Sequence, residues 1–151
     1  MTNPVFKIVD NPTVWWPVTL NVPVDGGVHE QRRIEACIRV LPESTYQEKL
    51  EPLAARQREL RDNPAAVLDL SAAHLREYVV DWRGIVDTEG AIPISGLPDL
   101  IRGPYGRPLT DGLWRAIAEV RFGLPPQHEG ATAKNSVPSP APGQATAAPT
   151  N

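Results

Sequence analysis

Only a few residues of the sequence have the type and spacing that catalysis requires. His74 and Asp81 are about two helical turns apart, so on one continuous helix they would share a face as a general base and its orienting carboxylate. No serine or cysteine nucleophile lies in a recognisable turn to complete such a site, and a lone helical histidine is most often structural. His29 and His128 have no assignable role. We therefore predict that the protein is not an enzyme.

Metal and phosphate sites are equally weak in the sequence. Asp87-Thr88-Glu89-Gly90 resembles part of a calcium loop, but the glycine comes too early and Gly96 occupies the place of the last carboxylate ligand. Gly103 and Gly106 flank a turn that lacks the preceding strand and the Lys-Ser or Lys-Thr of a phosphate loop. We expect no metal and no cofactor.

Composition narrows the class of protein further. The 151 residues include 17 prolines, 11 glycines and 41% hydrophobic residues, which suits one domain with a modest core. Fifteen basic and eighteen acidic residues give a net charge of -3 without a basic stripe, so we expect no nucleic-acid partner. The single cysteine, Cys37, allows no intrachain disulfide and is expected as a free thiol on the polar face of a strand. No signal peptide or membrane span is expected, because no apolar run reaches about 18 residues.

The elements that must position any site begin with a predicted β-hairpin. Apolar residues occupy every second position over 16–24 and again over 34–40, and a glycine-rich turn at 25–27 separates the two runs. Pro17 and Pro23 lack amide donors, which places the first strand at a sheet edge or limits its partner contact to one side.

Two further features surround the start of this hairpin. The alternation sends only one ring of the pair Trp15-Trp16 inward, so the other ring must pack at an edge or face a partner. An apolar run at 5–9 predicts a further short strand before the Asn11-Pro12 turn.

Helices are expected to follow the hairpin and cover its apolar face. A surface helix over 44–61 is kinked or restarted at Pro52, and Asn63-Pro64 then starts a helix whose apolar stripe runs as far as Val79 and Trp82.

Shorter elements complete the folded part. Residues 83–95 predict a tight turn between extended pieces, and 97–101 a helical turn with Ser95 as its cap. Trp114 is expected to pack in the core from a last helix that ends at Gly123.

The predicted fold class is α+β. An N-terminal antiparallel hairpin or small sheet is packed by three to four helices in a single domain over residues 1–123. Residues 124–151 are rich in proline and alanine and have no aromatic residue, so they predict a disordered tail.

The order of several short motifs is also informative. The motifs are Phe6-Lys7-Ile8-Val9-Asp10-Asn11-Pro12, Trp16-Pro17-Val18, Asp81-Trp82-Arg83-Gly84-Ile85-Val86-Asp87, Gly90, Pro93-Ile94-Ser95 and Lys134-Asn135. Over residues 5–135 this arrangement resembles the tail assembly chaperones of bacteriophages with long, non-contractile tails, the siphophage type.

The resemblance implies a non-enzymatic role in the cytoplasm of an infected host cell. Such a chaperone coats the tape measure protein, keeps it soluble, helps to recruit tail tube protein, and is absent from the mature virion. Self-association along the tape measure would let several copies cover one long partner. A tape measure helix exposes apolar surface until the tube encloses it, so a temporary apolar cover suppresses aggregation. The alternative is a structural virion tail protein, such as a tube or terminator subunit.

The residues expected to bind the tape measure protein lie on the hairpin and the first helix. Near-neutral charge offers little electrostatic attraction, so the binding is expected to be apolar. The predicted contact residues are Trp15, Trp16, Tyr46, Leu50, Leu53 and Leu60.

Overall fold

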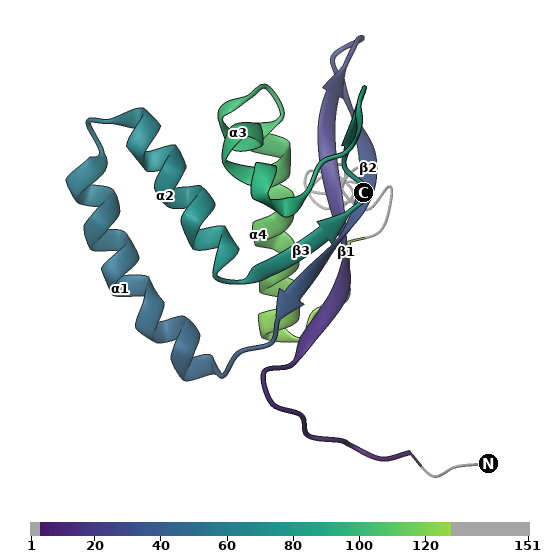
Figure 1. Ribbon diagram of the computed structural model, residues 1–151, viewed down its shortest axis with the longest axis vertical. Helices are drawn as coiled ribbons and strands as arrows, with labels where there is room; N and C mark the ends of the chain where they lie inside the picture. Colours follow the sequence, from purple (N-terminus) through teal and green to yellow (C-terminus); the bar gives the residue numbers. More distant parts are fainter. Residues whose placement is uncertain (1–3, 128–151) are drawn as a thin grey trace, which may run out of the picture.

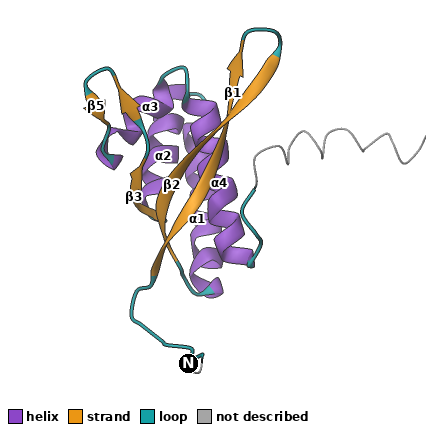
Figure 2. Ribbon diagram, turned by 90° about the vertical axis from the view of Figure 1, so that its right-hand side faces the viewer, coloured by secondary structure: helices purple, strands orange, loops and turns teal. Residues whose placement is uncertain are grey.

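The computed structural model describes residues 4–127, and these form an α+β fold of two layers (Figure 1). One layer is an antiparallel sheet in the order β1-β2-β3, and the other consists of four α-helices on one face of that sheet (Figure 2). The elements are β1 (Thr13–Val24), β2 (Val28–Arg39), α1 (Glu43–Leu60), α2 (Pro64–Arg76), β3 (Val79–Arg83), β4 (Val86–Asp87), β5 (Gly90–Ala91), the 3-10 turn η1 (Ile94–Gly96), α3 (Leu97–Arg102) and α4 (Gly106–Phe122).

The long hairpin forms as its alternating pattern predicts. β1 and β2 pair without interruption from Thr13 opposite Arg39 to Val24 opposite Val28. Gly26 and Gly27 have φ values of 97° and 77°, which glycine adopts without a steric penalty, and they allow the tight turn. β1 lies at the edge of the sheet, where its two prolines cost no ladder hydrogen bond.

The core lies between the sheet and α4. Ala36 and Ile38 of the central strand are fully buried, as is Leu113 of the helix. Gly112 brings the two layers into close contact, since a Cβ added there would lie 2.8 Å from the Thr19 carbonyl oxygen. α4 ends at Gly123, whose φ of 69° gives a left-handed cap as the sequence predicts.

The long helix predicted to run from Asn63 to Trp82 is wrong at its C-terminal end. α2 ends at Arg76, and Val79 and Trp82 belong to β3, the third strand of the sheet. Both residues are buried in the strand. A helix would place them on its apolar face as well, so their spacing does not distinguish helix from strand. The strand prevails because the open edge of β2 offers backbone partners and β-branched residues favour extended structure.

Four smaller predictions also need correction. Residues 5–9 form no strand, because the chain there runs away from the end of the sheet (Figure 1). α1 continues through Pro52 without a restart, and Ser95 lies inside η1, leaving Gly96 at the N-cap of α3. Cys37 is buried instead of exposed, because the central strand places it between Trp15 of β1 and Asp81 of β3.

Described residues after Gly123 contact β1 and α4. The Glu119 carboxylate accepts a hydrogen bond from the Gln127 amide at 3.1 Å, and the Thr19 hydroxyl donates to the Gln127 carbonyl at 3.2 Å. The start of the predicted tail is therefore attached to β1 and α4. The remainder of that predicted tail, 128–151, lies outside the described residues.

Candidate functional site

The two adjacent tryptophans of β1 point to opposite faces of the sheet. Trp16 packs against the helical layer, and its indole N–H donates to Glu119 of α4 at 2.8 Å. Trp15 lies on the other face with 38% of its surface exposed, and the guanidinium of Arg83 covers its ring at 4.1 Å. Arg83 in turn donates to Glu35 at 2.7 Å. Only Trp15 of this pair is available to a partner.

The predicted contact residues of α1 are divided in a similar way. Tyr46 is buried, Leu50 is 49% exposed and Leu53 is half-buried, and all three face a groove. Leu60 is half-buried at the far end of the helix and does not line this groove. The structure therefore brings three of the four residues to one site.

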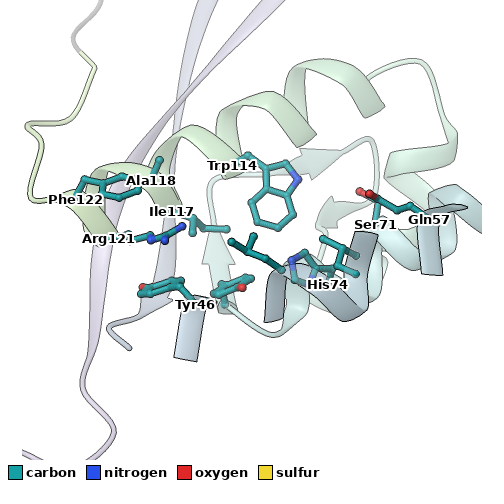
Figure 3. Close-up of a pocket in the computed structure, with 12 residues that line it drawn as sticks. Tyr46, Gln57, Ser71, His74, Trp114, Ile117, Ala118, Arg121 and Phe122 are labelled. Carbon is teal, nitrogen blue, oxygen red and sulfur yellow. The ribbon is translucent and has the colours of Figure 1, made fainter. Parts of the chain in front are cut away.

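We call this site the α1–α4 groove, and its volume is about 330 Å³. α1 forms one wall and α4 forms the other, while α2 and the following turn lie between them (Figure 3). Its lining is Tyr46, Leu50, Leu53, Gln57, Ser71, His74, Tyr78, Trp114, Ile117, Ala118, Arg121 and Phe122. Most of these side chains are aliphatic or aromatic, which is the usual lining of a site for an apolar ligand.

Stacked and edge-on rings form one side of the groove. The Tyr46 and Tyr78 rings stack with centroids 5.6 Å apart, and His74 meets Tyr78 edge-on at 5.2 Å. The Trp114 ring lies 5.1 Å from His74 and 5.8 Å from Tyr78. These rings come from α1, α2, the α2–β3 turn and α4, so the cluster fixes the position of α1 relative to the rest of the molecule.

An ion pair connects the N-terminus of α1 to the C-terminus of α4. Arg121 donates to the two Glu43 carboxylate oxygens at 3.0 and 2.6 Å, and its guanidinium lies over the rings of Tyr46 and Phe122. The hydrogen bond from Arg121 lowers the pKa of Glu43 to about 2, and the same bond raises the pKa of Arg121. The pair is therefore charged at neutral pH and closes one end of the groove.

Two polar groups lie within this apolar surface. Burial lowers the pKa of His74, Lys49 lowers it further, and Glu77 acts in the opposite direction, so the imidazole is neutral at pH 7. The Tyr46 hydroxyl is buried and has no hydrogen-bond partner among the described residues. A buried hydroxyl without a partner is uncommon in a folded protein.

The sequence does not predict the contributions of α2 and α4 to the groove. Trp114 is predicted to lie in the core, and no role is predicted for Phe122, which is 58% exposed. The signal in the sequence is a phenylalanine in the last turn of an amphipathic helix, just before the glycine that ends it. The spacing of apolar residues identifies the buried face of each helix but not the angle between helices, so it could not place α1 apart from α4.

The catalytic and metal-binding arrangements considered from the sequence are not assembled here. His74 lies in the groove on α2, whereas Asp81 lies on β3 and accepts a hydrogen bond from the Trp82 amide. Within 4–127, no group of three or more His, Cys, Asp or Glu side chains is arranged to hold a metal. Over the same residues, no helix combines the length and apolarity needed to cross a bilayer.

Comparison with known proteins adds no relative. No protein-family model matches the chain, and neither a curated protein nor a solved structure matches it significantly.

Proposed function

We propose that the protein is a phage tail assembly chaperone that holds a helix of the tape measure protein in its α1–α4 groove. The observation that supports this most directly is the groove itself, an apolar channel between two helices with exposed Leu50 and Phe122 on opposite walls. An amphipathic helix is the usual occupant of such a groove, and its apolar face contacts the walls at every third or fourth residue.

The energetic basis of this function is burial of apolar surface. Arg121 lines the groove, but its charge is already paired with Glu43. Charge attraction therefore adds little to the binding of a partner. Each fully buried leucine or phenylalanine contributes roughly 1.5–3 kcal/mol, so a few anchors suffice for reversible binding. Reversibility suits a protein that coats the tape measure in the host cytoplasm, helps recruit tail tube protein, and is released before the virion is complete.

Co-expression with the tape measure protein from the same genome tests the proposal. We expect soluble tape measure protein only when this chain is present, and we expect Leu50→Glu to abolish that rescue because it places a charge in the groove. Val86→Glu is the matched control, because Val86 is 68% exposed and does not line the groove. Tape measure protein that stays insoluble with the parent chain would contradict the proposal.

Trp15→Ala separates the groove from the hairpin as the binding surface. Equal rescue by Trp15→Ala and the parent would place binding in the groove alone. The alternative function, a structural subunit of the tail, predicts stoichiometric recovery of this chain from purified virions by mass spectrometry, whereas the chaperone predicts its absence.

A further inference from the structure

The segment before β1 carries four exposed apolar side chains. We call residues 4–12 the N-terminal arm, and they form neither helix nor strand. The exposed fractions are 84% for Val5, 90% for Phe6, 83% for Ile8 and 52% for Val9. Exposed apolar residues that follow one another in sequence are unfavourable in water and typically mark a binding segment. We therefore expect the apolar side chains of the arm to be buried against another surface.

The base of the arm directs it away from the molecule that carries it. Asn11 has a φ of 49°, a left-handed conformation that asparagine tolerates, and the Pro12 carbonyl accepts a hydrogen bond from the Val40 amide at 2.9 Å. Beyond this point the arm extends past the end of the sheet and away from all four helices (Figures 1 and 2). The surface that binds the arm is therefore expected on another molecule.

The edges of the sheet are poor acceptors for the arm. Pro17 and Pro23 remove two amide donors from β1. β3 is only five residues long, and the Trp82 amide already donates to the Asp81 carboxylate at 2.8 Å. Short strands, prolines and charged side chains are the features that prevent pairing at a sheet edge. The α1–α4 groove offers the arm apolar walls in place of a strand edge.

We propose that the N-terminal arm of one copy docks in the α1–α4 groove of a second copy. In an extended segment Phe6 and Ile8 lie on one side, about 7 Å apart, and can enter the groove together. The groove offers them Leu50 and Phe122 on opposite walls.

The size of the contact sets the strength of this self-association. Five residues of extended chain span about 17 Å, so one arm covers far less than the roughly 1,200–2,000 Å² of a stable interface. Reciprocal exchange doubles the contact, and open exchange produces a chain of copies. We expect weak association, with a dissociation constant on the order of 100 µM. A partner helix that binds more tightly would displace the arm.

Sedimentation of the full chain over a concentration series tests the inference. The parent should form species larger than the 16.5 kDa monomer as concentration approaches the millimolar range. A double substitution in the arm, Phe6→Ser with Ile8→Ser, should weaken association at least tenfold. Val5→Ser is the milder control, because Val5 lies on the opposite side of the extended arm. A parent that stays monomeric would overturn the proposal.

Mixing two variants tests which surface receives the arm. The arm variant keeps an intact groove, while Leu50→Glu keeps an intact arm, so each alone should be monomeric. Their equimolar mixture should form a one-to-one dimer and nothing larger, and Phe122→Glu should behave as Leu50→Glu does. Both groove substitutions are at exposed positions, and circular dichroism verifies their folding. A mixture without dimers would overturn the proposal, yet would leave tape measure binding to its separate co-expression test.

Discussion

At the scale of single residues, Glu119 is a buried acid with a purely structural set of partners. Its two carboxylate oxygens accept hydrogen bonds from the Trp16 indole and the Gln127 amide, which join α4 to β1 and to the end of the described chain. A sequence pattern that marks apolar positions cannot identify such a residue, because glutamate on a helix is usually solvated.

Glu119→Ala is predicted to destabilise the fold by about 1–3 kcal/mol, because it leaves two part-buried donors without their acceptor. Urea unfolding followed by tryptophan fluorescence measures this difference. Glu48→Ala, which removes an exposed glutamate from α1, should stay within about 0.5 kcal/mol of the parent. Equal stability of the two variants would show that the Glu119 hydrogen bonds contribute nothing.

His74 makes the unfolding free energy of the protein depend on pH. Burial lowers its pKa in the folded state, so the unfolded chain binds a proton more readily. The stability that neutral His74 contributes to the fold is fully present above its pKa in the unfolded chain, about 6.5. It is lost as the pH falls through the lower pKa that His74 has in the folded state.

The unfolding free energy of the parent should therefore fall more between about pH 7.5 and about pH 5 than that of His74→Gln. His29→Gln, which removes an exposed histidine far from the groove, is the control variant. If His74→Gln and the parent change equally with pH, the imidazole does not titrate abnormally.

At the scale of elements, the contact of α4 with β1 depends on Gly112. Alanine usually stabilises a helix interior by about 1 kcal/mol relative to glycine. Here the new Cβ would lie 2.7 Å from the Leu20 side chain and 2.8 Å from the Thr19 carbonyl oxygen. Gly112→Ala is therefore predicted to destabilise the protein by about 1–3 kcal/mol in chemical denaturation. A stabilised variant would mean that the two layers are farther apart.

The element-scale predictions from sequence succeeded where local signals agree. The hairpin turn at Gly26-Gly27, the Asn63 cap and the Gly123 stop each combine a pattern with a residue of special backbone preference, and each is confirmed. The third strand was missed because Val79 and Trp82 fit a helical stripe as well as a strand. Only pairing with β2, a contact distant in sequence, resolves that ambiguity.

At the scale of the whole molecule, α1 is the helix least attached to the rest. Tyr46 is its only buried residue among those described, whereas α4 buries residues along its whole length. The ring cluster and the Glu43–Arg121 pair hold α1 at one end. The groove was beyond sequence analysis for this reason: it results from how far α1 stands from α4, which no local pattern specifies.

The weaker attachment of α1 compared with α4 predicts the hydrogen-exchange behaviour of the free and bound protein. In the free chain, the amides of α1 should exchange faster than those of α4 and β2, because few buried contacts resist local opening of α1. Binding of the tape measure helix should slow exchange in α1 and in the C-terminal turns of α4. The hairpin turn at Asp25 to Gly27 serves as an internal control and should be unchanged. Protection that appears in β1 and its turn instead of α1 would transfer the binding surface from the groove to the hairpin and Trp15.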